Sequence, residues 1–412
     1  MTSEVDALVI GAGPAGASTA ILLAKAGWRV VLVERQVYPR QKVCGECLTA
    51  GSLALLDELG VGRAVRDKAG PELERVGWMS RARTIVADFP PCNDGPYPYG
   101  RALGRDQLDA LIMERAREVG VRVLQPSKVT SVRGGPGLFD CEIECDGGGP
   151  IVVRASTVVD GHGSWETAPE GIDGPAGQPK PRGSDLFGFK ASFRESTLAR
   201  GLLPVLSFEG GYGGMVLAED GRLTVACCIR RDTLRECRAR FPGASAGDAI
   251  EQYLRDSCRG VREVLRYAER SGPWLSVGAL RPGTRLGNHG ASRQGLFRVG
   301  NAAGEAHPLI GEGINMALQS AFLLSGELLK YPAASIDASR FRKIHQDYGQ
   351  AWQNAFARRL RLAAAYAHLA MRPALGAAAA LQCWPMLLTR AARWAGKAHS
   401  PPIPSATFEG TS

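Results

Sequence analysis

The stretch Gly11-Ala-Gly-Pro-Ala-Gly16 decides the fold, and it directly follows the mostly apolar run Val5-Asp-Ala-Leu-Val-Ile10. That run predicts a buried parallel strand. The Ala- and Leu-rich residues 17–26, closed by Gly27, predict a helix. Residues 29–34 (Arg-Val-Val-Leu-Val-Glu) predict a second parallel strand that ends in an acid. Strand, loop, helix and strand within about thirty residues are the βαβ unit of a nucleotide-binding fold.

Each glycine of the loop has its own physical role. Gly11 permits the tight turn out of the strand, Gly13 lets the backbone approach a pyrophosphate, and Gly16 lets the helix pack closely on the sheet. The free N–H groups and the dipole at the helix start favour phosphate oxygens. Glu34 lies 34 − 11 = 23 residues after Gly11 and can accept a hydrogen bond from a ribose hydroxyl. The unit therefore predicts dinucleotide binding, either FAD or NAD; the alternative is a glycine-rich turn that binds nothing.

Two later segments favour FAD over NAD. Residues 158–164 (Val-Val-Asp-Gly-His-Gly-Ser) and 296–304 (Leu-Phe-Arg-Val-Gly-Asn-Ala-Ala-Gly) each predict a strand end followed by a glycine-rich turn. The second turn continues into a predicted helix over residues 314–329. A helix N-terminus stabilises the negative charge that develops at the N1/C2 edge of a flavin when it is reduced. A protein that binds only NAD has no need of this second element.

Four motifs, in order along the chain, carry a family resemblance. They are Gly11-Ala-Gly-Pro-Ala-Gly16, Arg101-Ala-Leu-Gly-Arg105-Asp-Gln-Leu-Asp109, Asp160-Gly161, and Gly300-Asn301 with Pro308-x-x-Gly311-x-Gly313-x-Asn315. This set resembles the FAD-dependent superfamily that contains p-hydroxybenzoate hydroxylase (class A flavin monooxygenases), the geranylgeranyl reductases and the flavin halogenases. The family's fourth motif usually begins Gly-Asp. Asn301 replaces that Asp here, and because Asn still forms hydrogen bonds we expect FAD binding to be retained.

The resemblance implies a cofactor site and a fold. The implied FAD-binding residues are Gly11, Gly13, Pro14, Ala15, Gly16, Glu34, Arg35, Cys44, Arg105, Asp160, Gly161, Asn301, Pro308, Gly311, Gly313, Ile314 and Asn315. The implied fold class is α/β with an α+β second domain. It comprises a Rossmann-like FAD-binding domain of the glutathione reductase/p-hydroxybenzoate hydroxylase type, an antiparallel β-sheet substrate domain and a helical C-terminal tail.

Two candidate residues have alternative interpretations. Arg105 precedes a predicted helix over residues 108–118, where the helix dipole slightly disfavours a cation, so a ligand phosphate is expected to compensate. The alternative is a solvated arginine. His307 lies in the second glycine-rich turn and is the weak candidate for a general base or proton relay. The alternative is that it only bonds to the backbone.

Other segments indicate which branch of this superfamily the chain resembles most. Lys42-Val-Cys-Gly-Glu46 resembles the C-G-E segment of the geranylgeranyl reductase-like branch, to which we judge the chain closest. The W-x-W-x-I-P motif of the halogenases is missing, since the nearest stretch, Trp274-Leu-Ser, does not fit it, and this disfavours halogenation. The Asp160-Gly161 motif resembles one that is associated in hydroxylases with both FAD and NADPH, and this resemblance makes NAD(P)H the expected electron donor. The Arg that often follows the motif is absent here, since Ser164 is followed by Trp165 and Glu166.

The ten cysteines predict no metal site, because no second C-x-x-C and no histidine pair accompany Cys44 and Cys47. These two could form a redox pair. The preferred interpretation is that Cys44 packs beside the flavin. Glu46 is expected either to line a pocket or to lie on the surface at a helix start.

The domain organisation is expected to be discontinuous. The FAD-binding domain is predicted to comprise residues 1–75, 100–184 and 276–330, the substrate-binding sheet residues 76–99 and 185–275, and the helical tail residues 331–412. Strands of the sheet are predicted over residues 186–193, 203–208, 212–217 and 222–229, with a hairpin turn at 219–221. Tyr212, Phe208, Phe187 and Phe189 are candidates to line an apolar pocket, the alternative being ordinary core positions.

The tail is basic. Lys and Arg exceed Asp and Glu by 50 − 41 = 9 overall, and residues 340–400 contain ten basic residues against the single acid Asp347. A localised basic segment predicts contact with something acidic, such as a carrier protein or a lipid surface; the alternative is a solvated helical extension. Residues 373–389 are uncharged, but Gln382 and Pro385 argue against a membrane span. No nucleic-acid partner is expected.

These observations predict a cytoplasmic protein, peripheral at a membrane if the tail binds lipid, because the first strand begins too early for a leader peptide. The predicted function is an NAD(P)H-dependent monooxygenase that hydroxylates an aromatic, polyketide-like or other lipophilic secondary metabolite. One alternative is a flavin-dependent reductase of polyprenyl or other C=C bonds. Another is a flavin-binding partner of a biosynthetic complex without turnover.

Overall fold

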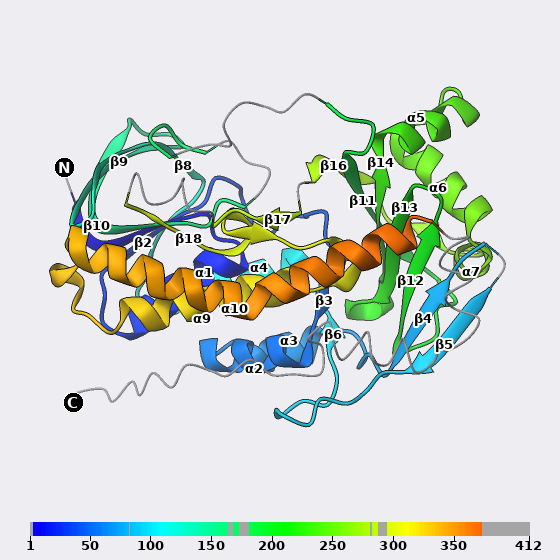
Figure 1. Cartoon of the computed structure of the whole chain (residues 1–412), viewed down its shortest axis with the longest axis horizontal. Helices are drawn as coiled ribbons and strands as arrows, with labels where there is room; N and C mark the ends of the chain where they lie inside the picture. The colour runs from blue at the N-terminus through cyan, green and yellow to red at the C-terminus, as the bar shows by residue number, and fades with distance from the viewer. Residues whose placement is uncertain are drawn as a thin grey trace.

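Two β-sheets lie toward opposite ends of an elongated molecule, and one long helix runs along both (Figure 1). The computed structural model describes residues 3–81, 83–163, 168–172, 181–280, 282–286 and 295–372. The predicted fold class is confirmed: a Rossmann-like domain is joined to a domain built on a largely antiparallel sheet, and a helix ends the described part.

The first sheet has the order β7-β2-β1-β10-β9-β8, with β18 also paired to β10. Its strands are β1 (Ser3–Ile10), β2 (Val30–Val33), β7 (Arg122–Leu124), β8 (Ser127–Gly135), β9 (Leu138–Cys145), β10 (Ile151–Asp160) and β18 (Phe297–Arg298). The neighbours of β1 are both parallel to it, and Ile10 is in register with Val33 and with Asp160. The carboxyl ends of these three strands therefore meet at one edge, where ligands bind in this class of sheet.

Helices α1 (Pro14–Lys25) and α4 (Arg105–Glu118) pack on this sheet, and α9 (Gly313–Leu328) packs against α1. Helices α2 (Ala50–Leu59) and α3 (Gly62–Lys68) lie farther out, α2 against α9 and α3 against α4. The helix predicted over residues 108–118 begins earlier than expected, because Gly104 is its N-cap and Arg105 its first residue. Two short ladders pair β3 (Cys47–Leu48) with β6 (Arg101–Ala102) and β17 (Gly283–Thr284) with β19 (Gly304–Glu305). The 3₁₀ turns are η1 (Glu219–Gly221), η2 (Gly300–Ala302), η3 (Pro308–Ile310) and η4 (Ala333–Ser335).

The second sheet has the order β15-β11-β14-β13-β12-β4-β5, with β16 paired to β11. Its strands are β4 (Arg75–Met79), β5 (Thr84–Asp88), β11 (Leu186–Arg194), β12 (Leu202–Phe208), β13 (Gly211–Leu217), β14 (Leu223–Arg230), β15 (Glu269–Arg270) and β16 (Leu275–Leu280). Helices α5 (Arg231–Arg240), α6 (Ala246–Ser257) and α7 (Arg259–Val264) form a core with one face, through residues such as Phe193 and Ile250. The other face is left to contact the FAD-binding domain.

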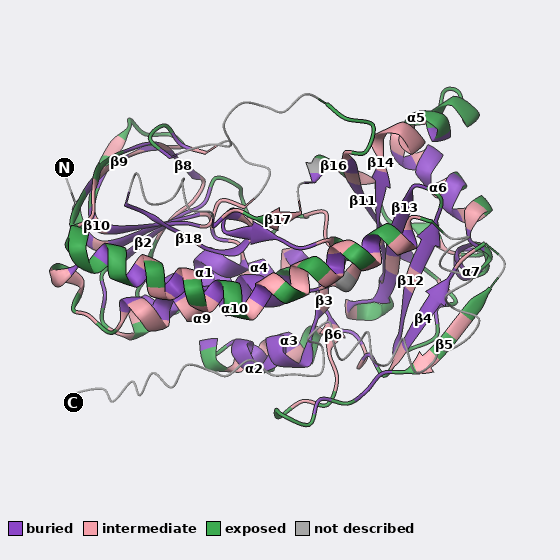
Figure 2. Ribbon diagram, viewed as in Figure 1, coloured by how far each residue is buried: buried purple, intermediate pink, exposed green. Residues whose placement is uncertain are grey.

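Helix α10 (Ala338–Ala370) ties the two parts together. Its buried side chains form one stripe along the helix, which Figure 2 shows as purple on one side and green on the other. Trp352 and Phe356 belong to the core of the FAD-binding domain, whereas Ala367 and Ala370 belong to the cluster on the second sheet. At its end Ala370 O accepts a hydrogen bond from Ser207 Oγ at 2.7 Å.

In the described residues, no helix is both long and apolar enough to span a lipid bilayer. The uncharged stretch 373–389 and the last basic residues of the tail lie outside the described part. The predicted contact of this tail with a carrier protein or a lipid surface therefore stays a prediction.

Candidate active site

The first glycine-rich loop packs tightly against the protein at Gly11 and Gly16 and borders open space at Gly13, so that it forms a cradle. Gly11 has φ +88°, and a Cβ on Gly16 would lie 1.9 Å from Gly11 O, so neither position accepts a side chain. A Cβ on Gly13 would meet only Arg105 Nη2, at 3.9 Å. Helix α1 begins here with no side-chain cap and no acid in its first turn. Its free N–H groups therefore face an open space suited to a pyrophosphate.

Arg105 supplies a cation to this cradle. The side chain is buried and bonds Asp109 through two contacts, Nε to Oδ1 and Nη2 to Oδ2, both at 2.7 Å. Burial alone would lower the pKa of Arg105, but the Asp109 carboxylate outweighs it and raises that pKa above its usual range. Arg40 Nη2 lies 3.8 Å from Asp109 Oδ2 and 3.9 Å from Glu34 Oε2. Two guanidinium groups are thus held near the phosphate loop, where they can pair with phosphate oxygens.

Two acidic side chains, Glu34 and Asp160, lie at strand ends beside the first glycine-rich loop. Glu34 is buried, and its carboxylate accepts hydrogen bonds from Ala12 N and from Gln36 N, each at 2.8 Å. Asp160 is fully buried beside His162, and Arg298 Nε lies 3.6 Å from its Oδ2. Arg35, the other residue predicted at the end of β2, is exposed.

The second glycine-rich turn lies against the first. Gly300 has φ +60°, and a Cβ there would lie 2.7 Å from the Ala15 Cβ. Gly311 is also left-handed, with φ +63°, and α9 begins two residues later. The side chain of Asn315 turns inward, where its Nδ2 donates to Glu312 Oε2 at 2.7 Å. Among the residues predicted from this turn, those that line the cavity described next are Asn301, Pro308, Gly311, Gly313 and Ile314.

A single cavity connects the two glycine-rich turns to the second sheet. Its wall on the sheet side is mostly apolar, and includes Leu203, Val205, Tyr212, Gly214, Val216, Ala226 and Cys228. Val205, Gly214 and Ala226 are cross-strand neighbours in register, so the middle of this wall carries small side chains. Of the other aromatic candidates, Phe189 also lines the cavity, whereas Phe208 packs edge-on against Tyr253 in the core with the helices.

His307 is not among the residues that line the cavity, but it contacts Tyr212, which is. The Tyr212 hydroxyl lies 3.2 Å from His307 Nδ1. Burial and then the neighbouring His368 lower the pKa of His307 to about 4. Burial raises the pKa of Tyr212 well above its usual range. Both side chains are therefore neutral at pH 7, and the tautomer of the imidazole decides which of the two donates the hydrogen bond.

We expect the variant His307→Asn to flatten the dependence of stability on pH between about 6.5 and 4. The pKa of His307 is lower in the folded chain than in the unfolded chain, so the unfolded state binds more protons in this window. Folding stability then decreases as the pH falls, by about 2 kcal/mol from this residue. Denaturant unfolding of both proteins across the window measures the difference. Parallel curves for the two proteins would contradict the assignment.

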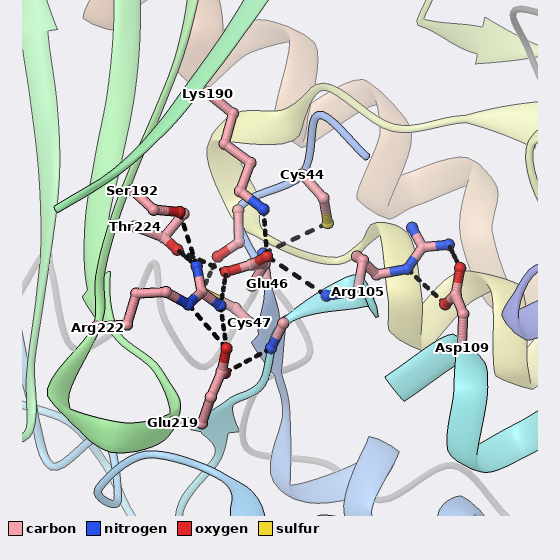
Figure 3. A network of polar contacts seen from close by, with 12 residues as sticks. Cys44, Glu46, Cys47, Arg105, Asp109, Lys190, Ser192, Glu219, Arg222 and Thr224 are labelled. Carbon is pink, nitrogen blue, oxygen red and sulfur yellow. Dashed lines mark hydrogen bonds and ion pairs between the residues drawn. The ribbon is translucent and has the colours of Figure 1, made fainter. Parts of the chain in front are cut away.

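A buried charge cluster beside the cavity was not predicted (Figure 3). Glu46 is fully buried with φ +59°, so its interpretation as a surface residue was wrong and that of a cavity-lining residue is confirmed. It pairs with Lys190 on β11 and with Arg222 Nη2 at 3.0 Å. Lys190 is the only charged residue between Leu186 and Phe193, and that isolated charge in an apolar strand is the signal that sequence reasoning missed.

The two cysteines of the C-x-x-C segment lie on the cavity wall and are not joined by a disulfide. Cys44 Sγ lies 3.4 Å from Glu46 N, which donates to it, and the Cys47 thiol donates to Gly45 O at 3.3 Å. Cys44 thus lies in the cavity that the flavin turn borders. In the part of the chain that the structure describes, no group of three or more His, Cys, Asp or Glu side chains could hold a metal ion.

Comparisons with known proteins agree with this geometry. Residues 4–173 match the family model described as an FAD binding domain. A tryptophan 2-halogenase from Chondromyces crocatus is 23% identical over 84% of this chain and 65% of its own length. A 6-methylpretetramide 4-monooxygenase from Streptomyces rimosus is 27% identical over 77% of this chain and 74% of its own. The chain thus spans slightly less than two thirds of that halogenase.

A solved structure shows the same fold over nearly the whole chain. It is a geranylgeranyl bacteriochlorophyll reductase-like protein from Thermoplasma acidophilum, with a TM-score of 0.69 and 18% identity, and the alignment covers 90% of this chain and 89% of that one. The matched domain and the two glycine-rich turns agree on FAD as the cofactor. The chain thus carries an FAD binding domain over residues 4–173, and its sequence and fold resemble those of the flavin monooxygenases, flavin halogenases and geranylgeranyl reductases.

Proposed function

We propose that the chain is an NAD(P)H-dependent monooxygenase that hydroxylates a lipophilic, polycyclic aromatic substrate of the polyketide type. The observation that carries this proposal is the mostly apolar cavity that joins the flavin turn to the second sheet. Its wall of small and aliphatic side chains, centred on Gly214 and Ala226, suits a flat apolar molecule. The similarity to a 6-methylpretetramide 4-monooxygenase supports the same class of substrate.

Bound FAD would supply the redox chemistry of a hydroxylation in which NAD(P)H and O₂ are consumed and water is formed with the product. The chain supplies placement and electrostatics. The free N–H groups at the start of α9, next to Gly313 and Ile314, stabilise negative charge at this edge of the cavity. The apolar wall excludes water from the reacting atoms. The Tyr212 hydroxyl, which lines the cavity and contacts His307, can exchange a hydrogen bond with a hydroxyl of the substrate.

A second candidate is reduction of a C=C bond in a polyprenyl-like substrate without O₂. The position of Cys44 favours it, because the C-G-E segment that resembles the reductase branch lines the cavity. The same apolar wall would accept an isoprenoid chain. This candidate differs from the first in needing no oxygen, which makes the two separable by one experiment.

We expect the FAD-loaded protein to oxidise NADPH or NADH at a rate that a tetracyclic aromatic polyketide increases at least tenfold, with one O₂ consumed per hydroxylated product. Coupled absorbance and oxygen-electrode measurements, with mass spectrometry of the product, check this. A reduced product formed under strict anaerobiosis would replace the proposal by the reductase. A product halogenated only when chloride or bromide is present would replace it by a halogenase. Bound flavin that neither NADPH nor NADH bleaches would indicate a flavin-binding partner without turnover.

A further inference from the structure

Four charged side chains from two domains meet in the buried cluster beside the cavity. Glu46 comes from the loop before β3, Lys190 from β11, and Glu219 and Arg222 from the hairpin before β14 (Figure 3). With two carboxylates and two cations, the formal charge of the cluster is 2 − 2 = 0. Lys190 and Glu46 are almost completely buried, so solvent screens this pair very little.

Glu46 is the centre of the cluster. Its Oε1 accepts from Lys190 Nζ and, at 3.3 Å, from Arg105 N, the first amide of α4. Its Oε2 accepts from Arg222 Nη2 at 3.0 Å and from Thr224 Oγ1 at 2.5 Å. Burial alone would raise the pKa of Glu46, but Lys190 and Arg222 outweigh it and hold the pKa below its usual value. Glu46 is therefore an anion at neutral pH.

The two cations differ in their other partners. Arg222 also donates from Nε to Glu219 Oε1 at 2.7 Å, so it keeps a carboxylate when Glu46 is neutralised. Lys190 has Glu46 as its single charged partner within the residues that the structure describes. The charge of Lys190 is thus balanced by Glu46 alone, and the pair behaves as one unit.

This unit borders the flavin cavity. Glu46 and Cys44 line it from the loop, Gly188 and Phe189 line it from the strand that carries Lys190, and Gly311 and Ile314 line it at the flavin turn. A flavin that gains two electrons becomes more negative, so each unbalanced charge on a buried wall changes its reduction potential. A balanced pair adds no net charge to the wall, so the dipole of α9 then sets the reduction potential of the flavin.

We infer that Glu46 and Lys190 form a charge-balanced pair that tunes the reduction potential of the flavin bound in this cavity. Neutralising Glu46 leaves Lys190 as an extra cation and raises the potential. Neutralising Lys190 leaves Glu46 with more negative charge than its partners balance and lowers the potential. Removing both restores the balance. The inference rests on FAD binding and not on the identity of the substrate, so it can hold even if the proposed hydroxylation fails.

The experiment is an equilibrium dye titration of the two-electron midpoint potential in the FAD-loaded wild type and in E46Q, K190M and the double variant E46Q/K190M. In E46Q we expect the ratio of affinities for reduced and oxidised flavin to rise about tenfold, which is about +30 mV for a two-electron couple. In K190M we expect a similar change of opposite sign. The double variant is expected within threefold of the wild type.

If the pair only holds the two domains together, a different result is expected. Both single variants then lose thermal stability, and their midpoint potentials change in the same direction or do not change. Either behaviour of the potentials overturns the inference. If E46Q gives no folded holoprotein, K190M and the double variant decide: K190M must lower the potential and the double variant must return it. The control is E263Q, which makes the same change in charge as E46Q. The side chains of Glu263 and Arg259 on α7 are 59% and 69% exposed, so solvent screens their charges. The midpoint potential of the flavin in E263Q should therefore equal that of the wild type.

Discussion

Replacing Gly13 by valine is expected to weaken FAD binding by at least about 100-fold, or about 2.8 kcal/mol, while the apoprotein keeps its fold. The backbone of Gly13 has φ −66° and ψ 177°, which valine adopts without strain. The new Cβ would meet only Arg105 Nη2, at 3.9 Å, so the protein itself has room for it. The branched side chain would instead fill the space in front of α1 where the pyrophosphate binds.

Flavin fluorescence during titration of the apoprotein measures the affinity, and circular dichroism with thermal unfolding measures the fold. Gly135→Val is the matched control, because a Cβ at that position on β8 has no atom within 4 Å and φ there is not left-handed. An affinity of the Gly13 variant within threefold of the wild type would show that the cofactor does not use this cradle. In contrast, a Cβ at Gly16 would lie 1.9 Å from Gly11 O, so substitution there should also damage the fold.

The second large effect is expected from Arg105, where stability and cofactor affinity can be separated. Arg105→Met leaves the carboxylate of Asp109, 1% exposed, without its bidentate partner. An uncompensated buried charge costs about 3 kcal/mol of stability, and Arg40, 3.8 Å from Asp109, keeps the loss toward the lower end of the usual range. FAD affinity is expected to fall at least tenfold as well, because a cation facing the phosphate cradle is lost.

The double variant R105M/D109L distinguishes these two effects. Replacing a buried ion pair by apolar side chains of similar size is often neutral for stability, so the apoprotein should regain most of its denaturant resistance. FAD affinity should stay low, because no cation has been restored. Recovery of affinity together with stability would mean that Arg105 acts only through the fold. Persistent instability with normal affinity would contradict both expectations.

Features carried by continuous segments could be predicted well. The strand, turn, helix and acid of residues 5–34 became β1, α1, β2 and the buried Glu34, and the helix predicted over residues 314–329 became α9 with a shift of one residue. These elements follow from local rules, since a left-handed turn needs glycine and a buried parallel strand needs a continuous apolar run. The carboxyl ends of parallel strands then share an edge whatever follows them in the chain.

Contacts between distant segments could not be predicted. Glu46 lies 144 residues from Lys190 and 178 from Thr224, and Tyr212 lies 95 residues from His307. The isolated charge of Lys190 in an apolar strand is unusual in itself, but nothing in the sequence around either residue of a pair identifies the other. The strand register that places Val205, Gly214 and Ala226 side by side on the cavity wall also arises only when β12, β13 and β14 pair.

The sequence by itself therefore determined a dinucleotide site at the edge of a Rossmann-like sheet, because the backbone geometry of a phosphate cradle is set by glycines and a helix start within a few residues of one another. The second glycine-rich turn then made FAD the expected dinucleotide. Only the tertiary structure decided what surrounds the flavin. The charge balance of Glu46 and Lys190, the neutral pair of Tyr212 and His307, and the apolar wall depend on how two domains pack, and packing is set by the sum of many weak long-range contacts rather than by any one segment.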